Sequence, residues 1–506
     1  MNSSCSYPSN LQSMIHLASS PTGIPPPHCA CGMESLATIF LSNNNLTGAI
    51  PNYSISLEIL DFSDNSLSGK IPPQIGVVCS NLKELNLGGN YLVGRIPSSI
   101  SNISSLQALT LASNELIGHI PHELSKLKSM KWIYFGYNKL SGEIPQELVD
   151  LVSLNHLNLF SNDFTSKIPN ALASLPHLQV IAIYSNNLIG EISSLICNIS
   201  SIEFLDLCDN NLSGTIPPCL GNFSKGFSIL DLQMNSFHGT IPETFGEDCG
   251  LRNLNFNGNK LEGSLPRSLF NCRNLQLMDM GNNKLSGTFP YWLDPLPNLQ
   301  VLVLRSNKLC GVLQSSKTTH PFPKLQILDL ANNEFTGPLP KGLNLSHNSL
   351  SGHIPMSMGN LTSLEWLDLS SNKLTGQIPD QLKDMTFLVI LNRSHNQLTG
   401  PIPQGKQFNT FENGSYEENL ALCGFPLSKS CNNNRRKQSS PSFLKEADDS
   451  ETEISFGWKV VLIGYGCGLI FGVVIGYVTF KNGEPKWFVT LYGVKYHPKG
   501  RRCSRN

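Results

Sequence analysis

The stretch LQALTLASNELIGHIP, residues 106–121, contains the pattern that decides the fold. Its leucines follow the spacing L-x-x-L-x-L-x-x-N-x-L, and they are Leu106, Leu109, Leu111 and Leu116. The alternation indicates a short strand with one buried face. Asn114 follows that strand, where an amide can hydrogen-bond backbone groups that no strand ladder serves. Gly118 permits a tight bend and Pro121 fixes an extended segment, so the stretch predicts a strand followed by a returning loop.

The same pattern recurs through most of the 506-residue chain, and most steps are 24 residues long. Aligned on the asparagine, its sixteen copies lie at Asn44, Asn65, Asn90, Asn114, Asn138, Asn162, Asn186, Asn210, Asn235, Asn259, Asn283, Asn307, Asn333, Asn348, Asn372 and Asn396. This period and leucine spacing predict an α/β leucine-rich-repeat solenoid with a parallel concave sheet and short irregular or 3₁₀ convex segments. At a strand spacing of roughly 4.8 Å, the sheet would be on the order of 75 Å long.

Composition excludes several classes of function. Only 14% of the residues are charged and the net charge is −1, so there is no electrostatic case for binding nucleic acid. No paired carboxylates, catalytic triad or phosphate-binding loop stands out from the repeat. No cluster of cysteine and histidine has zinc-site spacing. We therefore expect a binding protein that is not an enzyme and that uses no cofactor or metal.

Residues 458–480 predict one C-terminal transmembrane helix. The run 460–480 has no charged residue and reaches the roughly 20 positions that a bilayer requires. An acidic stretch, EADDSETE (446–453), precedes it, and a basic tail, 481–506, follows it. The positive-inside rule then places the C-terminus in the cytosol and the repeats outside the cell, as in a single-pass type I plasma-membrane protein. The alternative, a buried soluble helix, is disfavoured because the run lies outside the repeats.

Four glycines recur at every fourth position of this segment: Gly464, Gly468, Gly472 and Gly476. They fall near one helix face and allow a second helix to approach closely. The 26-residue tail has no room for a kinase and carries no kinase motif. A receptor with this tail must signal through a partner.

Two motifs carry a resemblance to a known family. The phrase L-x-G-x-I-P, recurring from Leu46 to Pro403, resembles the plant-specific class of leucine-rich repeat. The stretch PIPQGKQFNTFENGSYEENLALCGFPLSKSC (401–431), the acidic residues and WKVVLIGYGCGLIFGVVIGY (458–477) resemble plant receptor-like proteins, in the group of the tomato Cf resistance proteins. The resemblance implies a second small sheet, a twisted solenoid, and a kinase-lacking surface receptor that recognises pathogen-derived or wall-derived molecules in defence.

The resemblance also implies a partner and its contact residues. Receptor-like proteins pair with a kinase-bearing adaptor, a receptor-like kinase, through the membrane helix and the acidic juxtamembrane segment. Carried onto this chain, the adaptor contacts are Gly464, Gly468, Gly472, Gly476, Glu446, Asp448, Asp449, Glu451 and Glu453. From the residues alone, a solvated spacer is an equally good interpretation of the acidic run.

The expected domains follow the repeats. They are an atypical N-terminal segment (1–35), two repeat blocks (36–340 and 343–404) with a junction (341–342), a C-terminal cap (405–431), an acidic juxtamembrane linker (432–457), the transmembrane helix (458–480) and the cytosolic tail (481–506). The junction shortens one step to 15 residues, and it resembles the scar of a lost island domain. Residues 1–69 contain no Lys or Arg, so the basic region that begins a signal peptide is missing. The cap motif that precedes the first repeat in this family is also not found. We therefore expect either that the start of an ancestral gene has been lost or that this sequence begins late.

Cysteines and sequons fit an oxidising, secreted setting. Cys249 with Cys272, and Cys197 with Cys219, occupy similar positions in adjacent coils, within possible disulfide range, and buried free thiols are the alternative. The family's C-terminal cap implies a third disulfide, Cys423 with Cys431. Glycosylation is expected at Asn45, Asn52, Asn102, Asn198, Asn211, Asn222, Asn344, Asn360, Asn392 and Asn413.

A candidate ligand-binding patch emerges when exposed strand positions are compared across neighbouring coils. Aromatic and histidine side chains gather there: Trp132, Tyr134, Tyr137, His156, Phe160, Tyr184 and Phe204. Rigid aromatic groups with polar tips are typical of binding hot spots. The alternative is a solvated sheet face with incidental aromatic residues.

Arg393 occupies a position where the previous coil has Leu369. A buried unpaired charge costs several kcal/mol. We therefore expect either that the end of the solenoid frays or that Arg393 bends out to solvent.

The leading hypothesis is a plant cell-surface receptor-like protein that binds an extracellular peptide, protein or glycan. A developmental receptor for endogenous peptides is the first alternative. A soluble-type inhibitor of a secreted enzyme such as a polygalacturonase is the second, and the membrane segment argues against it. An inactive truncated paralogue is the third.

Overall fold

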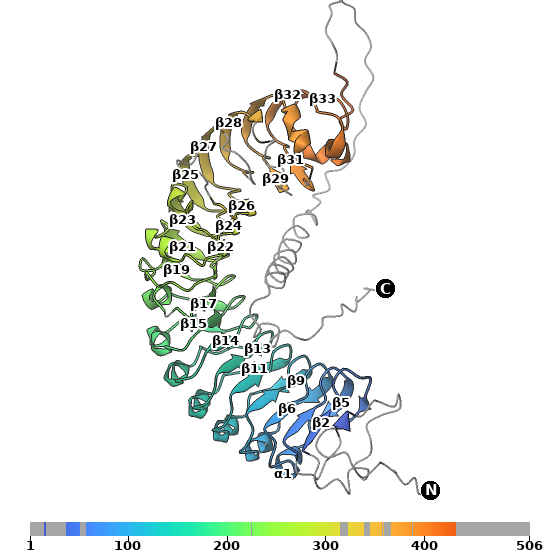
Figure 1. The fold of residues 1–506 in the computed structure, drawn as a ribbon, viewed down its shortest axis with the longest axis vertical. Helices are drawn as coiled ribbons and strands as arrows, with labels where there is room; N and C mark the ends of the chain where they lie inside the picture. The colour runs from blue at the N-terminus through green and yellow to red at the C-terminus, as the bar shows by residue number, and fades with distance from the viewer. Residues whose placement is uncertain are drawn as a thin grey trace, which may run out of the picture. The chain divides into compact units, whose positions relative to one another are not determined.

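In the computed structural model, the described residues wind into successive coils (Figure 1). The residues that it describes are 15–16, 37–50, 57–223, 225–313, 322–338, 345–356, 358, 366–386 and 388–431. The expected acidic linker, transmembrane helix and cytosolic tail lie outside these residues. Among the described helices, none is both long and apolar enough to cross a bilayer.

Short parallel strands, one from each coil, form the first sheet. Its 14 strands are β1 (Ile15–His16), β2 (Thr38–Phe40), β4 (Ile59–Asp61), β6 (Glu84–Asn86), β8 (Ala108–Thr110), β10 (Trp132–Tyr134), β12 (His156–Asn158), β14 (Val180–Ala182), β16 (Phe204–Asp206), β18 (Ile229–Asp231), β20 (Asn253–Asn255), β22 (Leu277–Asp279), β24 (Val301–Val303) and β26 (Ile327–Asp329). Beyond the junction, β29 (Trp366–Asp368) and β31 (Ile390–Asn392) pair in the same manner. The predicted parallel-sheet solenoid is therefore confirmed.

A second row of parallel strands follows each turn, as the plant-type repeat implies. Its first part contains β3 (Thr47–Gly48), β5 (Ser66–Lys70), β7 (Tyr91–Gly94), β9 (Glu115–Gly118), β11 (Lys139–Gly142) and β13 (Asp163–Phe164), and a pair follows, β15 (Ile189–Glu191) and β17 (Asn211–Ser213). The rest is β19 (His238–Thr240), β21 (Lys260–Gly263), β23 (Lys284–Gly287), β25 (Lys308–Val312), β27 (Glu334–Pro338), β28 (Ser349–His353), β30 (Lys373–Gly376), β32 (Gln397–Pro401) and β33 (Ala421–Cys423).

Short helices lie on the side of the coils opposite the first sheet (Figure 1). They are α1 (Ile75–Val78) and the 3₁₀ helices η2 (Ser98–Asn102), η3 (His122–Lys126), η4 (Gln146–Asp150), η5 (Asn170–Ser174), η6 (Ser194–Asn198), η7 (Pro218–Gly221), η8 (Arg267–Asn271), η9 (Tyr291–Leu293), η11 (Asp380–Asp384) and η12 (Lys406–Thr410). The last 3₁₀ helix, η13 (Asn413–Ser415), instead lies beside β31. Pro121 caps η3 with φ −62° and ψ 126°, so the Ile-Pro phrase holds the chain extended until the helix begins.

The leucines and the asparagine of each repeat have separate roles. The leucine side chains of the opening stretch are fully buried, and Gly118 adopts the positive φ (82°) that its bend requires. The Asn114 amide donates to the Leu111 and Leu87 carbonyl oxygens at 3.1 and 2.9 Å, while its oxygen accepts from the Leu92 amide at 3.0 Å. All sixteen predicted asparagines bond backbone carbonyls through the side-chain amide. We call this row the asparagine ladder.

The asparagine ladder and the second sheet run across the shortened step between the two repeat blocks. The Asn348 amide donates to the Leu330 carbonyl at 3.0 Å, and its oxygen accepts from the Phe335 amide at 3.2 Å. Thr336 of β27 pairs with Ser349 of β28. Residues 339–344, which include the expected junction, lie outside the described part of the chain. On either side of them, the coils are joined by the same bonds as elsewhere.

The C-terminal cap continues the ladder one step further than the repeat pattern predicts. The Asn419 amide donates to the Arg393 carbonyl at 2.9 Å, and its oxygen accepts from the Leu398 amide at 3.0 Å. The structure also contains the three expected disulfides, with Cα–Cα distances of 5.8 Å for Cys197–Cys219, 4.7 Å for Cys249–Cys272 and 5.1 Å for Cys423–Cys431.

The expectation that Arg393 bends out to solvent is wrong. Its side chain is 0% exposed, and its guanidinium carbon lies 4.8 Å from the Phe408 ring centroid and 5.0 Å from that of Tyr416. Both rings come from the C-terminal cap, which closes over the last coil. The cap therefore covers a charge that the repeat pattern alone would leave at an open end.

Candidate functional site

Neighbouring strands bring the predicted aromatic patch together. Trp132 of β10 pairs with His156 of β12, and His156 in turn pairs with Val180 of β14, which pairs with Phe204 of β16. Side chains at paired positions of parallel strands point to the same face of a sheet. The strand residues of the patch, Trp132, His156 and Phe204, therefore rest on regular strand register. Tyr137, Phe160 and Tyr184 follow their strands.

Two groups of rings make up this patch. The Phe160 and Tyr184 rings stack with centroids 4.4 Å apart and planes inclined by 4°, and Tyr137 meets Phe160 edge-on at 4.8 Å. The His156 ring lies 6.4 Å from both Trp132 and Tyr134. Tyr137 has the positive φ (53°) that recurs before the ladder asparagines, so the turn sets its direction. Phe204 is joined to the others only through strand register.

Burial favours the neutral forms of Tyr134 and His156. It raises the pKa of the Tyr134 phenol to about 12 and lowers the pKa of His156. The Nδ1 atom of His156 and the Oδ1 atom of the neighbouring Asn158 are buried without a hydrogen-bond partner. Such groups favour a polar contact with a bound molecule. The repeat pattern did not single out Asn158, although it stands in the same strand-position column as Tyr134.

An acidic group adjoins the patch on the next strands. The ligand atoms of Asp206, Cys208 and Asp231 lie within 4.8 Å of one another. Each carboxylate, however, already accepts the backbone N–H two residues on, from Cys208 at 3.1 Å and Gln233 at 3.0 Å. The same bond recurs at Asp61, Asp279, Asp329 and Asp368. It is therefore a feature of the repeat that caps the turn, and we do not assign a metal to it.

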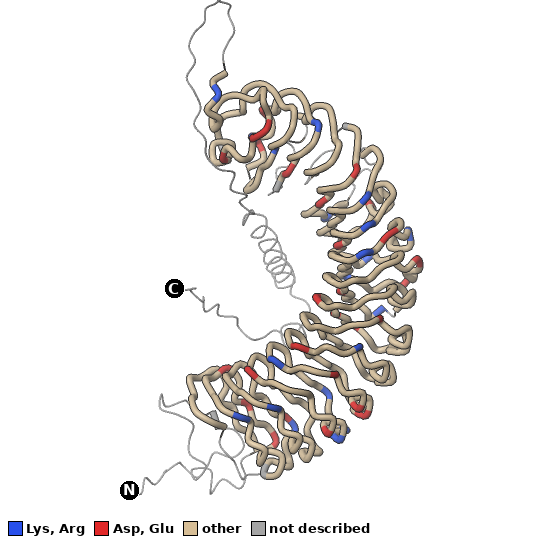
Figure 2. Tube along the Cα trace, turned by 180° about the vertical axis from the view of Figure 1, so that it is seen from behind, with Lys and Arg blue, Asp and Glu red and all other residues tan. Residues whose placement is uncertain are grey.

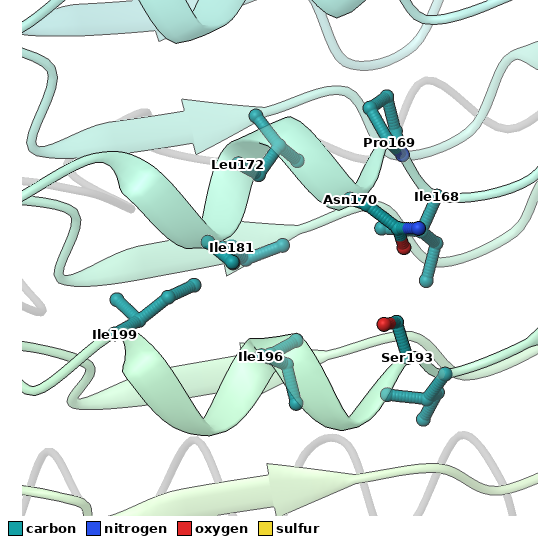
Figure 3. A pocket seen from close by; sticks show the side chains of 10 residues that line it. Ile168, Pro169, Asn170, Leu172, Ile181, Ser193, Ile196 and Ile199 are labelled. Atoms are coloured by element: carbon teal, nitrogen blue, oxygen red, sulfur yellow. The ribbon is translucent and has the colours of Figure 1, made fainter.

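Elsewhere on the first sheet of the described coils, we find no comparable cluster of aromatic side chains. Basic and acidic residues are spread along the described coils without a basic stripe (Figure 2). An apolar cavity of about 20 Å³ lies between the coils of η5 and η6, lined by residues such as Leu172, Ile181 and Ile196 (Figure 3). It has room for about one water molecule and is a packing gap.

Other predicted site residues are placed as follows. Six sequon asparagines are exposed: Asn45, Asn102, Asn198, Asn211, Asn222 and Asn413. Asn392 is half-buried on β31 and its side-chain oxygen accepts the Ser394 N–H at 3.1 Å. Asn52, Asn344 and Asn360 lie outside the described residues, as do all the adaptor contacts expected at 446–476.

Family comparison identifies the repeat. A family described as "Leucine rich repeat" matches residues 104–164 and 249–309. A second family of the same description matches residues 56–77, 81–103, 201–223, 324–343, 341–361 and 363–385. The matched segments lie on both sides of the shortened step.

Plant receptors are among both the curated and the solved relatives. Receptor-like protein Cf-9 of Solanum pimpinellifolium is 40% identical over 85 residues, which are 17% of this chain and 10% of Cf-9. The plant peptide hormone receptor RGFR1, solved in complex with RGF2, is 33% identical with a TM-score of 0.72, covering 79% of this chain and 65% of that one. The Arabidopsis HAESA ectodomain, solved with an IDA peptide hormone ligand, is 29% identical with a TM-score of 0.59, covering 81% and 82%.

The match to the curated relatives spans about a tenth of their length. The chain is therefore a leucine-rich-repeat protein, and it is similar to the plant receptor-like proteins, the group that includes Cf-9.

Proposed function

We propose that this protein is a plant cell-surface receptor that binds an extracellular ligand on its aromatic patch and acts in defence. The observation that carries the proposal is the gathering of neutral aromatic rings on one rigid sheet face, beside two buried polar atoms without partners. Preorganised rings bind with little loss of conformational entropy. The proposal assigns the protein no catalytic activity.

A site-specific cross-link tests the binding face. Peptides selected from a random displayed library on the full chain serve as probes. We expect a photo-reactive benzoylphenylalanine at Tyr184 to cross-link to the selected peptides. The same group at Tyr91, which is 54% exposed on β7 of the second sheet, should not. Cross-linking at Tyr91 alone would refute the assignment of the patch.

A developmental role is the second candidate function. It is favoured by the similarity to RGFR1 and HAESA, whose solved complexes contain peptide hormones. In that case the ligand is an endogenous peptide, and the patch remains its binding face. Binding by endogenous secreted peptides, with none by pathogen-derived or wall-derived molecules, would favour the developmental role over defence.

We further propose that the signal passes to an adaptor receptor-like kinase through the membrane segment. The expected effect of Gly468→Leu with Gly472→Leu is at least a tenfold loss of co-purifying receptor kinase from plant membranes, because bulky side chains keep the helices apart. The matched control, Ile470→Leu with Val474→Leu, changes the opposite helix face and should retain the kinase. Equal recovery with both double variants would contradict this pairing.

A further inference from the structure

Arg393 is a fully buried charge with too few partners. Its side chain is 0% exposed, yet its Nε and Nη1 atoms have no hydrogen-bond partner. Only Nη2 donates, to the Tyr416 hydroxyl, and this bond is long at 3.4 Å. Burial lowers the pKa of Arg393 to about 10, so the guanidinium stays charged at neutral pH. Contact with the Phe408 and Tyr416 rings offsets only part of the lost hydration.

The free-energy cost of burying this charge weakens the interface between the last coil and the C-terminal cap. The two rings that contact the Arg393 guanidinium come from the C-terminal cap. Backbone bonds, the Asn419 side chain and the pairing of β33 with β32 join the cap to the last coil. The Arg393 and His395 amides donate to the Ser415 and Glu417 carbonyl oxygens, both at 2.8 Å. The equivalent bonds one coil earlier, from Leu369 to Asn392 and from Ser371 to Ser394, enclose an ordinary leucine core.

Solenoid stability is approximately a sum of terms between neighbouring coils. A weak interaction between the cap and the last coil therefore lowers the free energy needed to open the cap, and it does not weaken the other coils. Opening returns the Arg393 guanidinium to water, where all its N–H groups are hydrated. It also exposes Phe408, Phe411 and Tyr416, which are buried in the closed cap.

We propose that the C-terminal cap, residues 405–431, is a built-in conformational latch that opens ahead of the solenoid, with Arg393 as the residue that keeps it weakly closed. The cap directly precedes residue 432 in the chain, so opening frees the link between the repeats and the segment that follows them. This device is independent of the ligand-binding patch. The fraying expected for this end of the solenoid thus takes the form of a defined opening.

Hydrogen–deuterium exchange on the full chain tests the latch. The Arg393, His395 and Leu398 amides bond to the cap, while the Leu369, Ser371 and Leu374 amides make the equivalent bonds one coil earlier. After correction for intrinsic rates, we expect the first set to exchange at least tenfold faster. Arg393→Met, which removes the charge and keeps most of the volume, should slow the first set at least tenfold and leave the second unchanged.

Arg393→Leu provides a second neutral variant, and Arg393→Lys is the charge-retaining control. The lysine variant should exchange as fast as the wild type or faster, because its ammonium is buried without the planar ring contacts. Equal wild-type rates in the two sets would overturn the proposal. So would unchanged cap exchange in both neutral variants.

Discussion

Asn210→Ala is expected to destabilise the solenoid by about 3–5 kcal/mol, because the change removes the side-chain hydrogen bonds of Asn210 and leaves the Leu188 N–H without its acceptor. The Asn210 amide donates to the Ile183, Leu207 and Cys208 carbonyl oxygens, each at 3.1 Å. Its side-chain oxygen accepts from the Leu188 amide at 3.0 Å. Alanine supplies none of these bonds. The three carbonyl oxygens each keep one other donor, from Asn186, Asn235 and Ser185, so the Leu188 N–H is the group that loses its acceptor.

The neighbouring residue provides the matched control. Asn211 is exposed on β17, and its backbone N–H, which alanine retains, donates to the Leu188 carbonyl. Asn211→Ala should therefore change the free energy of unfolding by less than about 0.5 kcal/mol. Urea denaturation of both variants, followed by circular dichroism, measures the difference. Similar midpoints for the two variants would show that the asparagine ladder does not hold the coils together.

Much of this fold could be predicted because the repeat is strictly local. Leu109 and Leu111 are buried, and Asn114 bonds across coils, wherever the same spacing returns. Asn419 was missed because two residues separate it from Leu422, where the other repeats place one. The cap then accommodates the shifted spacing by pairing β33 with β32.

The fate of Arg393 was not predictable from its own coil. The leucine pattern shows that the position is buried, and it gives the cost of a charge there. It does not show that Phe408 and Tyr416 return from the cap to cover the guanidinium. The spacing of the repeats predicts contacts within and between repeats. It does not predict contacts made by residues outside the repeats, such as those of the cap.

The candidate site was predictable to a similar degree. Column positions correctly gathered Trp132 with His156, and Phe160 with Tyr184, since neighbouring coils repeat the same geometry. Ring geometry required the structure, because the stacking of Phe160 on Tyr184 depends on side-chain rotamers. The unpartnered Asn158 oxygen also required it, because the sequence does not show which polar atoms lack partners.

Loss of binding on truncation of the patch is the second large expected effect. Trp132→Ala with Tyr184→Ala removes one ring from each of the two groups in the patch. Buried aromatic hot spots each contribute about 2 kcal/mol or more, and each 1.4 kcal/mol is about tenfold in affinity. The double variant should therefore bind selected peptides at least about 100-fold more weakly than the wild type. The fold should persist, because both side chains lie outside the leucine core and the ladder.

The dissociation constant of the selected peptides for this double variant tests the binding proposal most directly. The comparison is with Tyr91→Ala, Ile117→Ala, which removes two side chains about half exposed on β7 and β9 of the second sheet. Titration calorimetry on the full chains is expected to show wild-type affinity for this control and a loss of at least about 100-fold for Trp132→Ala, Tyr184→Ala. Equal affinity of both double variants would contradict the claim that this receptor-like protein binds its ligand on the aromatic patch.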